Sequence, residues 1–279
     1  MRNLTLWMVV AIGIATAVVV GRHTRRPRVE PQPIASATTE TDAGRIRALL
    51  FAELQPIRLA NCELRRYGEP NDGGYLLCAN LLKDVRSAYS YGISGYDGWG
   101  CQVSRELQVM VHEYDCFDAR RPVCDGGARH FQTECVAGTP STDAQGHVFD
   151  TVEHQIAKNR DSNRHLLMKM DVEGAEWESL PAVPDAVLQS IDQLAIEFHG
   201  SGRPHFLDVV RRLKRFFYVA NLHFNNYSCS TDLSPFPSWA YEVLFVNKNL
   251  GHPAAAAQPS PLSPANAPNN PIAPDCQSQ

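Results

Sequence analysis

The sequence lacks several patterns that identify common protein classes. It has no G-x-G-x-x-G motif, which weighs against an NAD-dependent dehydrogenase. Its eight cysteines form no C-x-x-C pair, which disfavours a structural zinc site. The net charge is −4 and no extended basic block interrupts the central region, so no nucleic-acid partner is expected. Only one long apolar run occurs, which argues against several membrane spans.

That run, Leu4–Val20, is followed by four arginines within residues 22–28. A membrane-spanning helix needs about 20 apolar residues, so residues 1–28 are predicted to form an N-terminal apolar helix that anchors the chain. Ala15-Thr16-Ala17 has the form of a cleavage site, which leaves open a removed signal peptide and a secreted or lumenal protein. A buried core helix is the third alternative. The arginines favour a cytosolic domain, but a lumenal domain remains compatible with the sequence.

Two segments are predicted to lie outside the folded domain. Residues 29–45 are rich in Pro, Ser, Thr and Glu, which is typical of a linker. Residues 251–279 are rich in Pro, Ala, Ser and Asn and are expected to be disordered, because they cannot bury enough apolar surface. Residues 46–250 remain, which is enough chain for one substantial core.

The even number of cysteines permits disulfide bonds if the domain lies in an oxidising compartment. Cys124 and Cys135 are the pair expected to close a loop in that case. Cys116 is interpreted as a small buried hydrophobic residue. Asn226-Tyr227-Ser228 and Asn3-Leu4-Thr5 match the glycosylation sequon, which has meaning only in a secretory setting.

Strand-like and helix-like stretches alternate through the central region. The strand-like stretches are residues 88–94, 111–118, 131–137, 166–172, 193–199, 218–224 and 241–246. The helix-like stretches are residues 97–110, 149–158, 175–188 and 205–216. This alternation predicts an α/β fold with a mostly parallel sheet covered on both faces. No helix separates the last two strands, so an antiparallel pair is expected at one edge.

Open α/β sheets bind ligands beyond the carboxyl ends of their strands. Gly92 and Gly95 follow the first strand and could let the backbone approach a ligand closely, although an ordinary turn would also use them. Asp118 ends the second strand, where a carboxylate can accept hydrogen bonds from both ribose hydroxyls. Asp115 is a less favoured rival because it lies inside the strand, and helix capping is the structural alternative for Asp118.

Asp171 and Glu173 end the most apolar strand, and ionised carboxylates are costly to bury, so they indicate a cleft. One of them could instead cap the following helix. Glu197 and His199 end the next strand on one face, which would allow them to converge with Asp171. A histidine there suits a general base, although it could also be a hydrogen-bonded structural residue. Asp171, Glu197 and His199 could hold a divalent metal, but no ligand spacing requires one and none is expected.

Asn71-Asp72-Gly73-Gly74 is a strong turn signal ahead of the first core strand. It is interpreted as a loop or hairpin, and its position would let it fold over the ligand-binding edge of the sheet.

Residues 169–176, Lys-Met-Asp-Val-Glu-Gly-Ala-Glu, resemble the K-x-D-x-E-G-x-E motif of FkbM-related S-adenosylmethionine-dependent methyltransferases. Further segments are similar to a subgroup of methyltransferase-like proteins that often carry an N-terminal anchor or signal: residues 71–75, 89–93, 117–118, 197–199 and 241–247. The similarity runs from about Arg65 to Asn247.

The resemblance implies a class I methyltransferase fold, with a seven-stranded Rossmann-like sheet and S-adenosylmethionine as cofactor. Gly92 and Ser94 would face the methionine part of the cofactor, and Asp118 would hold its ribose. Asp171 and Glu173 would lie near the transferring methyl group.

The expected activity is O-methyl transfer to an unidentified acceptor, a small molecule or a glycan. His199 would remove the hydroxyl proton, and Asp171 or Glu197 would orient its ring. The alternative is a non-catalytic binding module of the same fold, anchored at a membrane. The sequence does not predict an oligomeric state.

Overall fold

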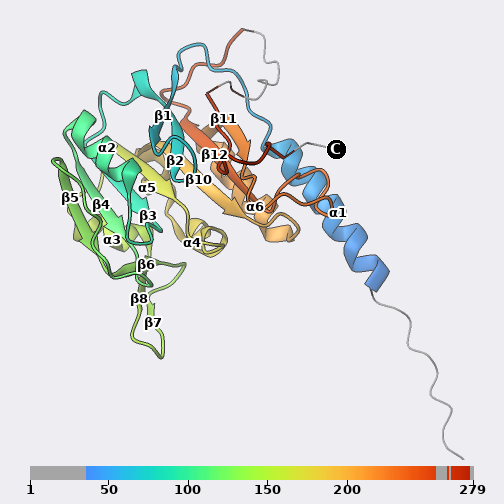
Figure 1. The fold of residues 1–279 in the computed structure, drawn as a ribbon, viewed down its shortest axis with the longest axis horizontal. Helices are drawn as coiled ribbons and strands as arrows, with labels where there is room; N and C mark the ends of the chain where they lie inside the picture. Colours follow the sequence, from blue (N-terminus) through green and yellow to red (C-terminus); the bar gives the residue numbers. More distant parts are fainter. Residues whose placement is uncertain (1–35, 256–262, 264, 277–279) are drawn as a thin grey trace, which may run out of the picture. The chain divides into compact units, whose positions relative to one another are not determined.

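The computed structural model describes residues 36–255, 263 and 265–276 of the chain (Figure 1). The apolar run predicted to anchor the protein, residues 4–20, lies outside this range. Within the described part of the chain, no helix is both long and apolar enough to cross a bilayer.

A seven-stranded sheet in the order β11-β12-β10-β9-β3-β4-β5 forms the centre of the fold (Figure 1). Its strands are β3 Ser87–Tyr91, β4 Met110–Tyr114, β5 Ala128–Gln132, β9 Leu166–Met170, β10 Ile191–His199, β11 Phe217–Phe224 and β12 Ala240–Asn247. Neighbouring strands from β5 to β10 pair in parallel, whereas β12 is antiparallel to both β10 and β11. The predicted mostly parallel α/β sheet with an antiparallel edge pair is confirmed, and it is consistent with a Rossmann-like fold.

The order of the strands reverses between β3 and β9. The chain moves outward from β3 through β4 to β5, and then returns to place β9 on the other side of β3. The Asp171 amide, just after β9, donates to the Tyr91 carbonyl at the end of β3, over 3.2 Å. In open α/β sheets a ligand crevice forms at this kind of reversal, beyond the carboxyl ends of the strands.

Side chains on both faces of the sheet are buried, in two separate core clusters. The helices are α1 Ser36–Glu53, α2 Gly98–Leu107, α3 Val152–Lys158, α4 Glu176–Ala182, α5 Asp185–Ser190 and α6 Pro204–Phe216. One core cluster joins Tyr89 and Tyr91 to α1, α3, α4, α5 and α6. The opposite cluster joins Ala88 to α2 and to a hairpin formed by β1 (Leu64–Gly68) and β2 (Gly74–Cys78). Because side chains alternate along β3, its two faces pack against different elements. One face belongs to the cluster with α1, α3, α4, α5 and α6, and the other belongs to the cluster with α2 and the hairpin.

The structure corrects both predicted boundaries of the domain. Residues 36–45 were expected to lie in a linker, but they form the first part of α1. Ile46 and Leu50 of α1 and Leu54, directly after the helix, are buried at intervals of four residues, so one apolar stripe packs into the core and stabilises the helix.

The predicted disordered tail, residues 251–279, is wrong for the described residues 265–276. Asn269 is only 1% exposed, and Cys276 is bonded to Cys229. The Asn226 amide donates to the carbonyls of Asn270, Ala273 and Pro274. A disulfide and polar contacts thus order a segment that has little apolar surface to bury. Asn226 is itself 7% exposed, so its sequon is inaccessible to glycosylation in the folded domain.

All eight cysteines are paired, as Cys62–Cys78, Cys101–Cys124, Cys116–Cys135 and Cys229–Cys276. The expected Cys124–Cys135 pair is therefore wrong, and Cys116 is a disulfide partner rather than an isolated hydrophobic residue. The parallel pairing of β4 with β5 brings Cys116 to Cys135, and Cys124 instead reaches α2.

The predicted strand at residues 131–137 consists of two strands in different sheets. β5 ends at Gln132, and β6 (Glu134–Val136) joins β7 (Ser141–Thr142) and β8 (Val148–Asp150) in a three-stranded sheet. The Cys116–Cys135 bond holds this small sheet against the end of β4. A short 3-10 helix, Ala79–Leu81, completes the described elements.

Candidate functional site

A cavity of about 510 Å³ lies at the carboxyl ends of β3, β4 and β9. We call it the Asp118 cavity, and its volume is typical of small-molecule sites. Its lining includes all five residues predicted to bind a cofactor: Gly92, Ser94, Asp118, Asp171 and Glu173. The structure therefore brings together residues from three separate strand ends.

The glycine turn after β3 is required by contact with the neighbouring strand end. Gly92 has φ of +72°, and a Cβ atom there would lie 1.6 Å from the Asp171 carbonyl oxygen. Lys169 Nζ donates to the Gly92 carbonyl over 2.8 Å, which binds the two strand ends together. The close approach that Gly92 permits is thus to Asp171 of the same chain.

β4 ends at Tyr114, so Asp115 lies outside the strand rather than inside it as predicted, and Asp118 lies in the following loop rather than at the strand end. The two carboxylates have different roles in this loop. The Asp115 carboxylate accepts hydrogen bonds from the amides of Ser94, Phe117 and Asp118, so it shapes the loops. The Asp118 carboxylate lines the cavity and accepts a hydrogen bond from Arg120 Nε over 2.9 Å. This side-chain hydrogen bond from Arg120 lowers the pKa of Asp118 to about 2. Asp118 is therefore ionised at neutral pH, with an exposed and displaceable arginine as its partner.

Four aromatic residues line this cavity, none was predicted as a site residue, and two of them are suited to contact a ligand. Phe117 is 72% exposed although it is a large apolar side chain, and it lines the cavity. The buried Tyr91 hydroxyl also belongs to the lining and has no hydrogen-bond partner within the described part of the chain. An exposed aromatic face and an unpaired buried hydroxyl both suit a ligand with a flat ring and polar groups.

Asp171 and Glu197 converge as predicted, through a tyrosine that sequence reasoning missed. The Tyr75 hydroxyl lies 2.9 Å from Asp171 Oδ2 and 3.3 Å from Glu197 Oε2. Burial, together with the charges of Asp171 and Glu242, raises the pKa of Glu197 to about 8. Glu197 therefore holds a proton at neutral pH and can donate it to Tyr75, while Tyr75 donates to Asp171.

His199 joins this cluster, but its partner differs from the predicted one. Nδ1 lies 3.1 Å from Glu176 Oε1, and Nε2 lies 3.8 Å from Asp171 Oδ1 and 3.6 Å from Glu173 Oε2. Glu176, rather than Asp171 or Glu197, thus orients the ring. Burial lowers the pKa of His199, but the hydrogen bond to Glu176 and the surrounding carboxylates outweigh it and raise the pKa to about 9.

Glu176 also stabilises the turn after β9. Its carboxylate accepts hydrogen bonds from the amides of Val172 and Gly174, while the cap residue of α4, Ala175, makes no side-chain capping bond. The alternative that Asp171 or Glu173 caps this helix is therefore wrong, because a residue inside its first turn reaches back instead.

Asp171, Glu173 and His199 could hold a metal ion. One ligand atom from each lies within 4.8 Å of the other two. Carboxylate oxygens with an imidazole nitrogen are suitable ligands for a divalent cation. Glu197, named with Asp171 and His199 in the sequence analysis, is not part of this set, and the expectation of no metal stays a prediction.

A second cavity, of about 470 Å³, is lined by His199, whose Nε2 atom lies 3.6 Å from Glu173 Oε2 of the first cavity. We call it the Trp239 cavity. Gly174 and His199 line it, whereas the neighbouring Glu173 and Ala175 line the Asp118 cavity. Arg47 of α1 also lines it, so a helix predicted partly as linker contributes to the wall. The rest of the lining comes from α4, from residues 200–206 and from the loop before β12.

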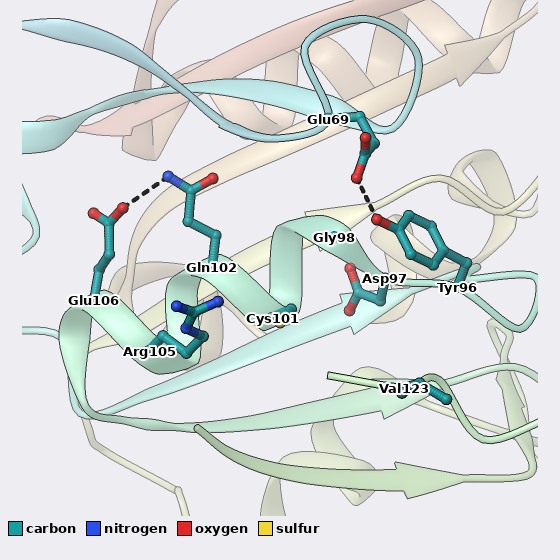
Figure 2. Close-up of a pocket in the computed structure, with 9 residues that line it drawn as sticks. All are labelled: Glu69, Tyr96, Asp97, Gly98, Cys101, Gln102, Arg105, Glu106 and Val123. Carbon is teal, nitrogen blue, oxygen red and sulfur yellow. Dashed lines mark hydrogen bonds between the residues drawn. The ribbon is translucent and has the colours of Figure 1, made fainter. Parts of the chain in front are cut away.

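A third hollow, also about 470 Å³, lies over α2 and is shown in Figure 2. Tyr96 donates to Glu69 there, and Gln102 donates to Glu106. Its polar side chains thus contact one another, and none of the predicted site residues lines it.

Comparison with models of known protein families gives no match to this chain, and comparison with curated protein sequences gives none. The assignment of a function therefore rests on the geometry of the two bordering cavities.

Proposed function

We propose that the chain is an S-adenosylmethionine-dependent methyltransferase that methylates a hydroxyl group. The observation that carries this proposal is the Asp118 cavity, where the five predicted cofactor residues meet at the reversal of strand order. The antiparallel β12 between β10 and β11 supports the class I methyltransferase form of the Rossmann-like sheet.

The residues of the Asp118 cavity fit this cofactor. The ionised Asp118 can accept hydrogen bonds from two ribose hydroxyls once Arg120 moves aside, and an ion pair with an arginine this exposed is weak because solvent screens it. Phe117 offers a ring face to adenine, and the unpaired Tyr91 hydroxyl offers a polar contact. When bound, the cofactor supplies a methyl group that is already activated for displacement.

The protein must then position an acceptor hydroxyl and take its proton. His199 lines the Trp239 cavity, and Glu176 holds its ring so that Nε2 faces Asp171 and Glu173, which line the Asp118 cavity. Only the neutral imidazole can accept a proton, and with a pKa of about 9 that form is a minority at neutral pH. His199 therefore works best as a base in alkaline solution.

The four disulfides support a domain on the oxidising side of a membrane, because such bonds persist in secretory and extracellular compartments. We infer a lumenal or extracellular domain, either anchored by residues 1–28 or released after their cleavage. When the unmutated protein is denatured without a reductant, an alkylating reagent should modify no cysteine. After reduction, the same reagent should modify all eight. Modification of most cysteines before reduction would contradict this placement.

Equilibrium binding of S-adenosylmethionine to the purified protein tests the proposal. We expect Asp118→Ala to weaken binding at least about tenfold, since it removes charge-assisted hydrogen bonds. Asp125→Ala is the matched control, because Asp125 is exposed and does not line the cavity. A native protein that fails to bind the cofactor would refute the proposed function.

One observation favours the alternative of a non-catalytic binding module: His199 is mostly protonated at neutral pH. Methyl transfer to hydroxyl-bearing acceptors, assayed at pH 7 and pH 9 with and without a chelator, separates the two functions. Cofactor binding without turnover at either pH would favour the binding module. Turnover that is present without the chelator and lost when the chelator is added would indicate a metal ion at Asp171, Glu173 and His199.

A further inference from the structure

The Trp239 cavity is placed to receive the acceptor. Its wall meets that of the Asp118 cavity at residues 173–175, and His199 Nε2 approaches Glu173 across this border. A molecule in the Trp239 cavity would therefore have its nearest groups beside the predicted site of methyl transfer.

The charged side chains of the Trp239 cavity favour an anion. Arg47 and Arg203 both line it, and neither has a carboxylate within 4.0 Å in the described part of the chain. Arg47 Nε donates to the Ser234 carbonyl over 3.2 Å, which fixes the side chain without neutralising its charge. The cavity lining contains one carboxylate, that of Glu178, which lies 3.9 Å from His205. The balance of charge in this cavity is thus positive.

Two buried polar atoms of the same cavity lack hydrogen-bond partners among the described residues. Ser201 is only 3% exposed, and its Oγ atom is unpaired. His205 Nε2 is buried and also unpaired, since its separation from Glu178 is too long for a hydrogen bond. Buried polar groups normally have partners, so unpaired ones on residues that line a cavity are consistent with a ligand that carries hydroxyl groups.

The rim and the floor of the cavity suit a sugar ring. Trp239 is 44% exposed at the rim, and the negative face of an indole attracts polarised C–H groups. Gly200 has φ of +87°, and a Cβ atom there would lie 3.6 Å from Trp239 Nε1, so the glycine keeps the space beside the indole open. Gly202 keeps space beside Arg47 in the same way, because a Cβ atom there would lie 3.6 Å from Nη1.

We propose that the Trp239 cavity binds a sugar acid, with Arg47 and Arg203 on its carboxylate, Ser201 and His205 on its hydroxyls, and Trp239 against its ring. This inference rests on the proposed function only in making the bound sugar the methyl acceptor. Binding of the sugar acid itself needs no cofactor.

Binding of p-nitrophenyl β-D-glucuronide and p-nitrophenyl β-D-glucoside to the whole purified protein tests this inference. The two probes differ by a carboxylate in place of a hydroxymethyl group. Without cofactor, we expect the Kd of the glucuronide to be at least about tenfold lower than that of the glucoside. The glucoside lacks the carboxylate and so cannot accept charge-assisted hydrogen bonds from the two arginines. Arg203→Gln and Arg47→Gln should each narrow this ratio, and Trp239→Ala should raise both Kd values.

Arg86→Gln is the matched control, since Arg86 is exposed and lies outside this cavity. Equal Kd values for the two probes, or a ratio unchanged in both arginine variants, would overturn the proposal. S-adenosylmethionine binding is measured on the same preparations. Glucuronide selectivity without cofactor binding would refute the methyltransferase function alone, and cofactor binding without selectivity would refute the acceptor site alone.

Discussion

The Asp118 cavity and the Trp239 cavity have neighbouring wall residues at positions 173–175, but their walls are built differently. In the Asp118 cavity, backbone amides satisfy Asp115, Arg120 pairs with Asp118, and Tyr75 and Lys169 hold Asp171. In the Trp239 cavity, two arginines lack carboxylate partners and a buried serine hydroxyl is unpaired, within the described residues. Apart from the Tyr91 hydroxyl, the polar groups of the first wall named above already have partners within the protein. Several polar groups of the second wall have no such partner in the described part of the chain and are free to contact a ligand.

This difference suits the two ligands that we propose. A cofactor site can be preformed by strand ends and tight turns, because its ligand is always the same. An acceptor site must distinguish one substrate from others, and buried polar groups that only the correct ligand satisfies provide that selectivity. The comparison can be tested by changes that affect one cavity and spare the other.

The largest expected effect is that of Gly92→Ala, which places a Cβ atom 1.6 Å from the Asp171 carbonyl in a left-handed backbone conformation. We expect it to lower the free energy of unfolding by more than about 3 kcal/mol. Gly174 also has a positive φ, of +104°, but a Cβ atom there would meet no atom of the described residues within 4 Å. Gly174→Ala is therefore expected to lower the free energy of unfolding by only about 1 kcal/mol. Urea unfolding measures both, and equal losses would show that the contact with Asp171 does not matter.

Removing one disulfide at a time should separate the two cavities. Cys116→Ser/Cys135→Ser and Cys229→Ser/Cys276→Ser are each expected to lower the free energy of unfolding by about 2–4 kcal/mol. The first pair should weaken cofactor binding more, because Cys135 lines the Asp118 cavity. The second should weaken glucuronide binding more, because Leu233 and Trp239 follow Cys229 and line the Trp239 cavity. Identical losses in both assays would mean that the disulfides act only on overall stability.

The pH dependence of turnover should reflect His199, which lines the Trp239 cavity and lies beside Asp171 and Glu173 of the Asp118 cavity. The pKa of His199 is raised to about 9, so its neutral, proton-accepting fraction grows as the pH rises toward that value. Turnover should therefore increase about tenfold between pH 7 and pH 8. His199→Gln should remove this increase while cofactor binding persists. A native rate that is flat over this range would exclude His199 as the base.

The smallest expected effect concerns Arg120, the exposed partner of Asp118. Arg120→Ala should strengthen cofactor binding by less than about fivefold, since it frees the Asp118 carboxylate from a weak surface pair. The same substitution should leave glucuronide binding unchanged, because Arg120 lies outside the Trp239 cavity. Weaker cofactor binding would show that Arg120 is itself a ligand contact.

Much of the Asp118 cavity could be predicted from local patterns. Apolar stretches of strand length located β3, β4, β9 and β10, and the parallel sheet they imply aligns their carboxyl ends at one edge. The convergence of Asp171, Glu197 and His199 followed from this alignment, because β9 and β10 are neighbours in parallel. The Trp239 cavity could not be predicted in this way, since its wall combines α1, the loop before α6 and the loop before β12.

The order of residues along the chain by itself determined the alternation of strands and helices, and with it the carboxylates, glycines and histidine at the strand ends. These follow from the periods of single elements, which neighbouring residues encode. Only the tertiary structure decided the four cysteine pairs, the hydrogen bond from Tyr75 to Asp171, the contact of Glu176 with His199 and the packing of residues 265–276. Each of these joins segments that are distant in the sequence, so the contact depends on how whole elements pack and leaves no periodic pattern in either segment.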